Sequence, residues 1–497
     1  MLLTDDLLFD YQRCDRLSFL NVYGDWRDRD RPSDFVLKLK QDSQHYRNSV
    51  LAHTDYETPR YPSGDWVAGA KATLELMRQG AERIYQGVLY AEDSQGVTLL
   101  SRPHLLIKQP GPSAFGEWHY SVMEIRFSKR PKAEHQVMVA FHTYVLAQVQ
   151  EVWPHQGWVV TREKGFSAVN LAKYGRLMRG IMGQCLEMLE KRQEPEVFIA
   201  RHPCGLCEWY SSCYAIAESN HHLSLLPGVT PTRYRQLQQL DVTTVEALAD
   251  ADPEKLAIAL EAACNNQYAP EVVATQLILQ AQATLGDRAI PKPGQVPIAP
   301  HLLPVSPIEL YFDIEAEPEL DVDFLFGVLA IDRRNLCNGT EPRQTFYPFF
   351  AETPAEEERI WNEFLSLIWS YPIAPIFHFC DYEFQTLKKL AKRYRTPAQR
   401  WRPILKRFVD IHKLATRSAI APVENYALKS LARWLGFDWR ESLASGAQCV
   451  LWYDRWLETG DRRYLEAILS YNEDDCRATY VVKDWLVNFS QTHSQPH

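Results

Sequence analysis

Tyr311-Phe312-Asp313-Ile314-Glu315 is the stretch that decides the fold of the C-terminal part of this 497-residue chain. An apolar run ends in two acids two positions apart, and alternate side chains of a β-strand point to the same face. Asp313 and Glu315 are therefore expected to present two carboxylates side by side. Because Mg²⁺ and Mn²⁺ prefer oxygen ligands, this pair predicts a divalent-cation site.

Two further acidic motifs follow in the same part of the chain. The segment Phe377-His378-Phe379-Cys380-Asp381-Tyr382-Glu383 has the pattern of a strand that runs into an acidic turn. In the helical stretch Tyr471-Asn472-Glu473-Asp474-Asp475, Tyr471 and Asp475 are four residues apart and share a face. Each motif is common by chance, but the ordered set of three favours one shared site.

In this order the motifs resemble those of the DEDD exonuclease superfamily, and more narrowly its RNase H-like members with a tyrosine in the third motif. The resemblance covers roughly residues 308–490. It implies a 3′–5′ exonuclease in which two Mg²⁺ or Mn²⁺ ions hydrolyse a phosphodiester bond. Asp313 and Glu315 would form the first motif and Asp475 the third, with Tyr471 orienting the attacking water.

The second motif departs from the pattern of the family, which commonly reads Tyr-Asn-Gly-x-x-Phe-Asp. His378 replaces the asparagine and Phe379 the glycine, while the aromatic falls on Tyr382 and the acid on Glu383. We prefer Glu383 as the fourth metal ligand, with Asp381 as its rival. An RNase H-like fold that has lost activity is the alternative.

The composition excludes some classes of protein. The chain is 46% hydrophobic and 24% charged with a net charge of −9, as in soluble globular proteins. It has no run of eighteen apolar residues, so a membrane span is not expected. The acidic start, Met1 to Asp6, does not fit a signal peptide. We therefore expect a cytoplasmic protein whose ten cysteines are mainly reduced or metal-bound.

A local excess of basic residues interrupts this acidic average. Between Gln385 and Arg417, eleven Lys and Arg residues stand against one acid, Asp410. Such a run predicts either a solvated helix face or contacts to nucleic-acid phosphates. The candidates for phosphate contact are Lys388, Lys389, Lys392 and Arg393.

Proline marks the main boundary in the chain. Six prolines between Asp287 and Pro307 predict a semi-rigid linker over 287–307, because proline at that density sustains neither a helix nor a central strand. Residues 1–215 mix helices and strands, and 216–286 are helical. Strands and helices alternate over 308–497, which indicates an α/β structure. The strands expected there are 308–315, 324–331 and 375–379.

Cysteines cluster near the end of the first part. The segment Cys204-Gly205-Leu206-Cys207 and then Cys213 form a C-x2-C-x5-C pattern, which favours a metal site. Three thiolates need a fourth ligand, and Cys14 can supply it from the other end of the domain. The alternative is a zinc ion completed by His202 or His221.

One early cysteine and a late cluster of three resemble the iron–sulfur nucleases of the RecB-like group, which includes some CRISPR-associated nucleases. The resemblance implies that a 4Fe-4S cluster joins the two ends of a PD-(D/E)xK nuclease core over residues 1–215. Together with the exonuclease motifs, it extends over nearly the whole chain. The cluster ligands would be Cys14, Cys204, Cys207 and Cys213.

The catalytic residues of that front core are altered. The family pattern has an Asp after Pro on one strand and (Asp/Glu)-x-Lys on the next. Glu124 is retained, but His104 stands in the place of the Asp and Arg126 in the place of the Lys. Neutral histidine is a poor magnesium ligand, and arginine cannot deprotonate. We therefore expect a degenerate front site, retained as a DNA-binding scaffold.

The middle part contains Leu225-Leu226-Pro227-Gly228-Val229 between helical stretches. This arrangement resembles helix–hairpin–helix modules, which bind DNA phosphates through the amides of the turn. Because Thr230-Pro231 replaces the second glycine, a plain helical connector is the alternative.

These features predict an enzyme that trims 3′ ends of nucleic acid, DNA in preference to RNA, in repair or recombination, with a possible helicase or repair partner. An RNA-processing exonuclease is the first alternative. A DNA-binding adaptor with two decayed sites is the second.

Overall fold

The computed structural model describes residues 1–93, 96–200, 204–261, 269–294, 298–334, 342–441 and 445–493. They form two compact units, Met1–Ile216 and Ala217–His497. His202, one of the two histidines considered as a zinc ligand, lies outside the described residues. Among the helices of the described ranges, none has the length and apolar character needed to cross a membrane.

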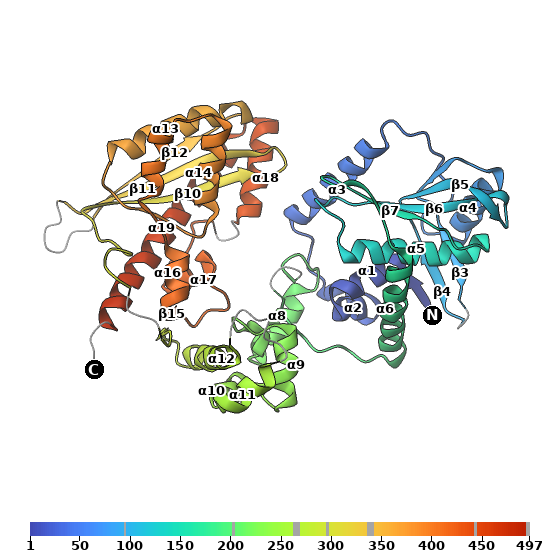
Figure 1. Cartoon of the computed structure of the whole chain (residues 1–497), viewed down its shortest axis with the longest axis horizontal. Helices are drawn as coiled ribbons and strands as arrows, with labels where there is room; N and C mark the ends of the chain where they lie inside the picture. The colour runs from blue at the N-terminus through green and yellow to red at the C-terminus, as the bar shows by residue number, and fades with distance from the viewer. Residues whose placement is uncertain are drawn as a thin grey trace. The chain divides into compact units, whose positions relative to one another are not determined.

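A five-stranded sheet in the order β12-β11-β10-β13-β14 forms the centre of the C-terminal unit (Figure 1). β10 and β12 are antiparallel to β11, whereas β13 is parallel to both β10 and β14. The strands are β10 (Ile308–Glu317), β11 (Val322–Asp332), β12 (Arg343–Phe350), β13 (Ile376–His378) and β14 (Phe408–Asp410).

The three strands expected from the sequence are present, but β12 and β14 were not foreseen. β12 contains Pro348, which lacks a backbone N–H and argues against a central strand. The sheet accepts it because β12 is an edge strand. β14 also lies at an edge and has only three residues, too few to show a pattern.

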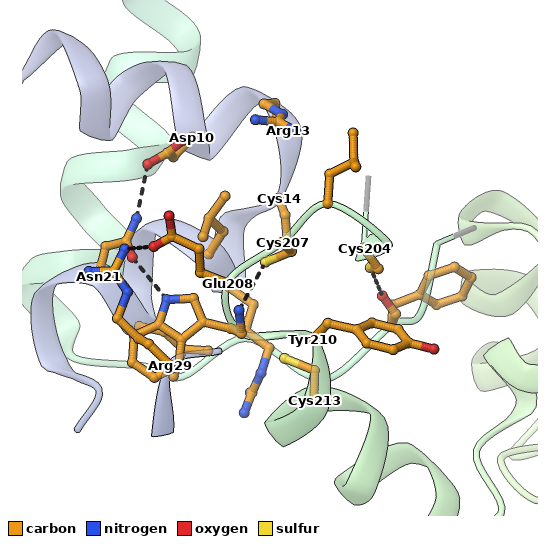
Figure 2. A pocket seen from close by; sticks show the side chains of 16 residues that line it. Asp10, Arg13, Cys14, Asn21, Arg29, Cys204, Cys207, Glu208, Tyr210 and Cys213 are labelled. Atoms are coloured by element: carbon orange, nitrogen blue, oxygen red, sulfur yellow. Dashed lines mark hydrogen bonds and ion pairs between the residues drawn. The ribbon is translucent and has the colours of Figure 1, made fainter. Parts of the chain in front are cut away.

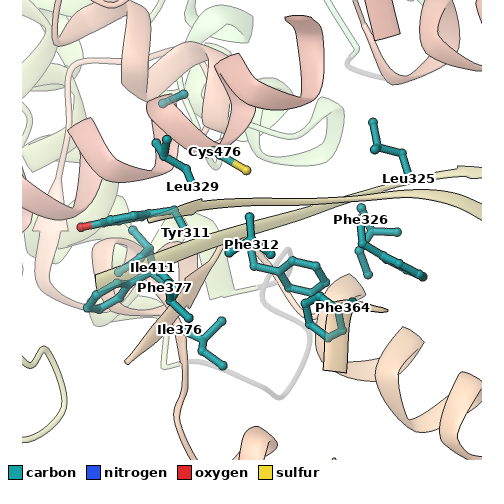
Figure 3. Packing of buried hydrophobic residues seen from close by; sticks show 14 of the residues in the cluster. Tyr311, Phe312, Leu325, Phe326, Leu329, Phe364, Ile376, Phe377, Ile411 and Cys476 are labelled. Atoms are coloured by element: carbon teal, nitrogen blue, oxygen red, sulfur yellow. The ribbon is translucent and has the colours of Figure 1, made fainter. Parts of the chain in front are cut away.

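Apolar side chains on both faces of β10 and β11 bind the sheet to its helices (Figure 3). On one face, the ring centroid of Phe312 lies 4.6 Å from that of Phe364 in α13 (Glu357–Ser370). On the other face, the Sγ of Cys476 in α19 (Arg462–Thr492) lies 3.5 Å from the carbonyl oxygen of Gly327 in β11. Asp313 and Glu315 alternate with Phe312, so they point toward α19.

Several further helices complete this domain. Next to the sheet, a buried ion pair fixes α19 to β10, because Lys483 Nζ lies 2.8 Å from Glu309 Oε1 and both side chains are almost fully buried. The further helices are α14 (Tyr382–Arg393), α15 (Ala398–Leu405), α16 (Ile411–Ser418), α17 (Leu428–Trp434) and α18 (Gly446–Thr459).

The helical middle part packs against this domain within the same unit. The Gln280 side chain donates a 2.7 Å hydrogen bond to the carbonyl oxygen of Ala421, and β9 (Ile290–Pro291) pairs with β15 (Ala419–Ile420). The segment predicted as a semi-rigid linker over 287–307 therefore contributes a short strand near its start. The helices are α9 (Pro231–Gln239), α10 (Val245–Ala249), α11 (Pro253–Leu260) and α12 (Pro270–Leu285).

The N-terminal unit contains a five-stranded sheet in the order β2-β5-β6-β7-β8 and a three-stranded sheet in the order β1-β4-β3. The long helix α5 (Ala133–Gln150) is buried along most of its length and packs on strands of both sheets. The strands are β1 (Leu2–Thr4), β2 (Arg83–Tyr85), β3 (Leu89–Glu92), β4 (Thr98–Ser101), β5 (Leu105–Ser113), β6 (Gly116–Ile125), β7 (Gly157–Thr161) and β8 (Gly165–Ala168).

The other helices of this unit surround the two sheets. They are α1 (Asp5–Arg13), α2 (Asp15–Tyr23), α3 (Asp34–Leu51), α4 (Trp66–Gln79) and α6 (Leu171–Lys191), and α8 (Tyr210–Ser219) contains the boundary between the units.

Candidate active site

Three carboxylates meet where α19 crosses β10. Asp313, Glu315 and Asp475 each offer an oxygen atom, and these atoms lie within 4.8 Å of one another. Glu315 and Asp475 are buried and Asp313 is half-buried. Two residues from one strand face and one from a helix thus form an acidic group that could bind divalent metal ions.

Burial and mutual repulsion disfavour the charged forms of these acids. Burial, followed by repulsion from Asp475, raises the pKa of Asp313 well above its usual range and that of Glu315 to about 8. Burial also raises the pKa of Asp475 to about 7. A divalent cation would offset this repulsion, so the donor set fits Mg²⁺ or Mn²⁺.

Neighbouring donors hold the carboxylates in place. Asn472 Nδ2 donates a 2.7 Å hydrogen bond to Asp313 Oδ2, and Trp439 Nε1 donates a 2.7 Å hydrogen bond to Asp475 Oδ1. Neither residue was expected in the site. The sequence could have indicated Asn472, because it lies inside the third motif and three positions before Asp475 on the same helix face. Trp439 is remote from the motifs in sequence, so no local pattern indicated it.

The site also contains a tyrosine and a lysine. The hydroxyl of Tyr471 donates a hydrogen bond that lowers the pKa of Asp475, and burial raises the pKa of Tyr471 itself. Lys429 Nζ lies 5.1 Å from the centroid of the Tyr471 ring, and its charge also lowers the pKa of Asp475. Lys429, which no motif indicated, adds a positive charge beside the acids.

The two candidates for the acid of the second motif differ in their surroundings. Glu383 is buried in the first turn of α14, and its charge contributes to the raised pKa of Asp313. His378 Nδ1 lies 3.3 Å from Glu383 Oε2. Asp381 is exposed and accepts a 2.6 Å hydrogen bond from the side chain of Gln385.

The four basic residues chosen as phosphate contacts fall into two pairs. Lys389 Nζ lies 3.0 Å from Asp321 Oδ1, and the Arg393 guanidinium lies 2.6 Å from Glu357 Oε2. Lys388 and Lys392 are exposed on α14. Lys389 and Arg393 thus bind acids of their own domain, whereas the exposed Lys388 and Lys392 stay candidates for phosphate contact.

The four cysteines expected to bind a cluster line one cavity of about 150 Å³ (Figure 2). Cys14 lies between α1 and α2, while Cys204, Cys207 and Cys213 come from the end of the unit. Backbone N–H groups of Ala200 and Trp209 donate to the sulfurs of Cys204 and Cys207 at 3.3 and 3.4 Å. His221, the other candidate for zinc, does not line the cavity.

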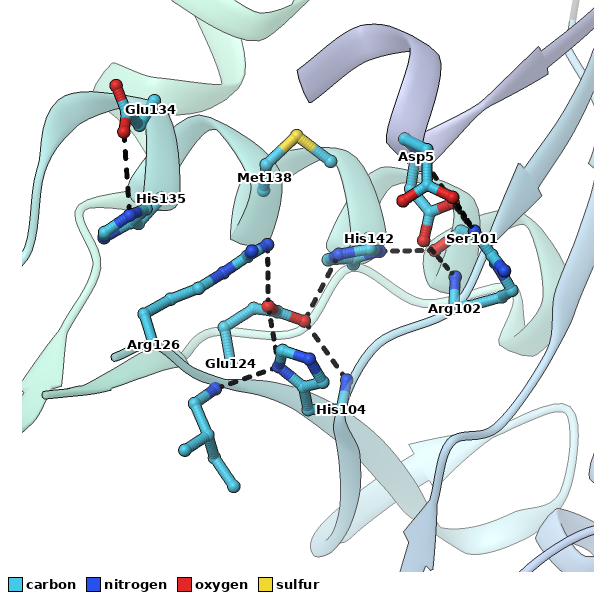
Figure 4. Close-up of polar contacts among 12 residues, drawn as sticks. Asp5, Ser101, Arg102, His104, Glu124, Arg126, Glu134, His135, Met138 and His142 are labelled. Atoms are coloured by element: carbon cyan, nitrogen blue, oxygen red, sulfur yellow. Dashed lines mark hydrogen bonds and ion pairs between the residues drawn. The ribbon is translucent and has the colours of Figure 1, made fainter. Parts of the chain in front are cut away.

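The front site residues also come together, but as a closed polar network (Figure 4). Glu124 Oε2 lies 3.0 Å from the Arg126 guanidinium and 2.9 Å from His104 Nδ1. Glu124 Oε1 lies 3.3 Å from Nε2 of His142, whose Nδ1 is 2.7 Å from the Ser101 hydroxyl. Arg126 and two histidines therefore surround this carboxylate.

Comparison with known proteins concerns the C-terminal domain. Residues 310–487 match the model of the RNase_H superfamily, a segment that contains most of the sheet, most of α19 and the acidic trio. The chain thus contains a C-terminal RNase H-like domain, which indicates a metal-dependent nuclease activity with nucleic acid as substrate. A search of curated proteins found no match to this chain.

Proposed function

We propose that the RNase H-like domain is a 3′–5′ exonuclease that trims DNA ends in repair or recombination. The observation that carries this proposal is the meeting of Asp313 and Glu315 with Asp475 at one point, with Tyr471 one helical turn before Asp475. Acids within 4.8 Å of one another, next to a protonated phenol, suit hydrolysis of a phosphodiester bond.

Asp313, Glu315 and Asp475 would hold two divalent ions together with Glu383, whose negative charge raises the pKa of Asp313. When bound, such ions activate water and stabilise the leaving oxygen. Tyr471 keeps its proton, because burial raises its pKa, and donates it in a hydrogen bond to Asp475, so its hydroxyl oxygen can accept a hydrogen bond from the attacking water and orient it.

Two other side chains would assist. His378 contacts Glu383 and limits its movement. Lys429 carries a positive charge next to Asp475 and would offset the charge of an approaching phosphate.

DNA is the preferred substrate in this proposal because the helical part that packs on the domain resembles the helix–hairpin–helix modules that bind DNA phosphates. Its turn at Gly228 has a positive φ of 88° and precedes α9, which begins after the N-cap Thr230. Such a turn before a helix N-terminus can bind a backbone phosphate. RNA is the second candidate, since the acidic trio itself does not distinguish the two nucleic acids.

For the N-terminal unit we propose a 4Fe-4S cluster held by Cys14, Cys204, Cys207 and Cys213. The four cysteines line one cavity, and backbone N–H groups donate to the sulfurs of Cys204 and Cys207. Hydrogen bonds to sulfur of this kind, with the pattern of one early cysteine and a late cluster of three, support an iron–sulfur centre.

The experiment that tests the exonuclease uses 5′-labelled single strands of DNA and RNA of one sequence, with Mg²⁺ or Mn²⁺. Progressive shortening of the labelled DNA to a ladder supports removal from the 3′ end. Immediate release of the labelled terminal nucleotide would instead show the opposite polarity. Faster digestion of RNA than of DNA would transfer the proposal to RNA processing.

The same assay decides between the two acids of the second motif. Glu383→Ala should remove activity, whereas the matched variant Asp381→Ala should keep it, because Asp381 is exposed and its carboxylate binds Gln385. The reverse result would assign the metal to Asp381.

A further inference from the structure

A second cavity, of about 480 Å³, lies in the N-terminal unit around Glu124. Its volume is in the range of small-molecule sites. Its lining combines charged and aromatic side chains, among them Arg47, Arg126, His104, Phe9, Tyr61 and Trp66. The inference below rests on this unit alone and does not depend on the exonuclease proposal.

A metal ion does not fit this cavity. Glu124 is the carboxylate at its centre, and the Arg126 guanidinium, 3.0 Å from Oε2, stands where a cation would bind. Glu124 Oε1 already accepts a 3.1 Å hydrogen bond from the backbone N–H of His104. Nδ1 of His104 accepts a 3.1 Å hydrogen bond from the backbone N–H of Ile125, so it is not free to bind metal. Magnesium needs several oxygen ligands, and they are not offered here.

The other acids of the cavity are also engaged. Asp5 and Asp6 both pair with Arg102, and Asp5 in addition accepts a 2.8 Å hydrogen bond from the backbone N–H of that arginine. Asp5 and Asp6 share Arg102 and Glu124 pairs with Arg126, so Arg47 is the arginine of this lining that does not pair with any of the three acids. Within the described residues, Arg47 has no acidic partner.

Two of the arginines keep unused donors. The Nε atoms of Arg47 and Arg126 are both buried and have no hydrogen-bond acceptor among the described residues. Buried N–H donors without an acceptor are rare in folded proteins, so the contacts within the protein do not use all the donors of these two arginines. Two guanidinium groups on one cavity are suited to the oxygens of a phosphate, which accept bidentate hydrogen bonds.

The wall of the cavity suits the remainder of a nucleotide. Tyr61 and Trp66 line it together, with ring centroids 6.3 Å apart, and the Phe9 ring lies 5.0 Å from the Arg126 guanidinium. Aromatic faces of this kind stack on nucleobases. We propose that this cavity binds the phosphate of a nucleotide or of a nucleic-acid strand end without metal, through Arg47 and Arg126, with the base against Tyr61 and Trp66.

The test uses the full chain with Asp313→Ala, in EDTA, so that the acidic trio neither binds metal nor cuts. Isothermal titration compares deoxyadenosine 5′-monophosphate with deoxyadenosine, and 5′-phosphorylated, 3′-phosphorylated and unphosphorylated hexathymidylate. We expect the phosphorylated ligands to bind at least tenfold more tightly than their unphosphorylated forms. Whichever binds more tightly, the mononucleotide or one of the phosphorylated strand ends, identifies the source of the phosphate.

Variants then locate the site. Adding Arg47→Ala should weaken binding of the phosphorylated ligand at least tenfold, and Arg47→Lys should restore part of it. The matched control Arg78→Ala removes an exposed arginine of α4 that does not line the cavity and should leave binding unchanged. Circular dichroism monitors folding. Binding that requires Mg²⁺, or that is equal in Arg47→Ala and the control, would overturn the proposal.

Discussion

Asn472 of α19 donates a 2.7 Å hydrogen bond to Asp313 of β10, and the backbone beside this contact has no room for a side chain. Gly327 of β11 pairs with Asp313, and an ideal Cβ atom on it would lie 1.6 Å from Oδ1 of Asn472. The contact thus explains a glycine in the middle of a buried strand. It also joins the first and third acidic motifs directly.

We expect Asn472→Ala to lower metal affinity and exonuclease rate about 10- to 100-fold, as loss of an outer-shell partner of a metal ligand does. Gly327→Ala should act through the same contact, because the added methyl group displaces Asn472. In the double variant, the combined loss of metal affinity and exonuclease rate, expressed as free energy, should therefore be much smaller than the sum of the losses in the two single variants. Metal titration and digestion rates measure this coupling.

The control for this cycle is Asn488→Ala, which changes an exposed asparagine of the same helix. It should leave both quantities unchanged. Strictly additive losses in the double variant would show that Gly327 and Asn472 act independently.

The raised pKa values predict how pH affects the metal-free protein. The pKa is about 8 for Glu315 and about 7 for Asp475, against 4.5 and 3.8 in their unperturbed forms. The folded state therefore binds more protons than the unfolded state. Its free energy of unfolding should fall as pH rises from about 4 to about 8. Metal affinity should rise about tenfold per pH unit for each proton displaced.

Calorimetry in EDTA and in Mg²⁺ at a series of pH values measures both effects. Asp475→Asn removes one titrating carboxylate, so its metal-free stability should depend less on pH than that of the wild type. A variant with an unchanged pH dependence would show that Asp475 keeps an ordinary pKa.

The cysteine cavity predicts a link between metal content and stability. Cys14→Ser should lower both the metal content and the melting temperature, because metal binding by such sites is also folding energy. Analysis of protein purified without oxygen should find iron and sulfide. One zinc ion and no sulfide would contradict the 4Fe-4S proposal.

Cys185→Ala is the matched control, because Cys185 is fully buried in α6 and does not line the cavity. It should leave the metal content unchanged, whatever its effect on packing. Cys14→Ser with unchanged metal content would exclude Cys14 as a ligand.

Glu124→Ala is expected to change exonuclease activity little, because Arg126 and His104 already surround this carboxylate. Stability should respond strongly. Removing one partner of a buried ion pair costs about 3 kcal/mol, since Arg126 is left without its acid. Denaturant unfolding and the digestion assay separate the two effects, and a loss of activity as large as that of Asp313→Ala would show a live front site.

Local sequence patterns predicted the parts of the fold that have strong periodicity. The apolar strand ending in Asp313 and Glu315 and the helix carrying Tyr471 and Asp475 could be predicted, because each pattern is contained in a few residues. β12 could not, since Pro348 is tolerated only through its edge position, a property of the sheet. Trp439 and Lys429 reach the site through packing of remote segments, which leaves no signal in local spacing.

The measurement that tests the central claim most directly compares wild type, Asp313→Ala and Asp381→Ala in digestion of labelled single-stranded DNA with Mg²⁺ or Mn²⁺. The account predicts that Asp313→Ala loses more than about a hundredfold in rate, beyond the loss expected for an outer-shell residue, while its fold and melting curve persist. Asp381→Ala should digest DNA like the wild type. A folded Asp313→Ala protein with activity within a few-fold of the wild type would contradict the assignment of the acidic trio as the active site.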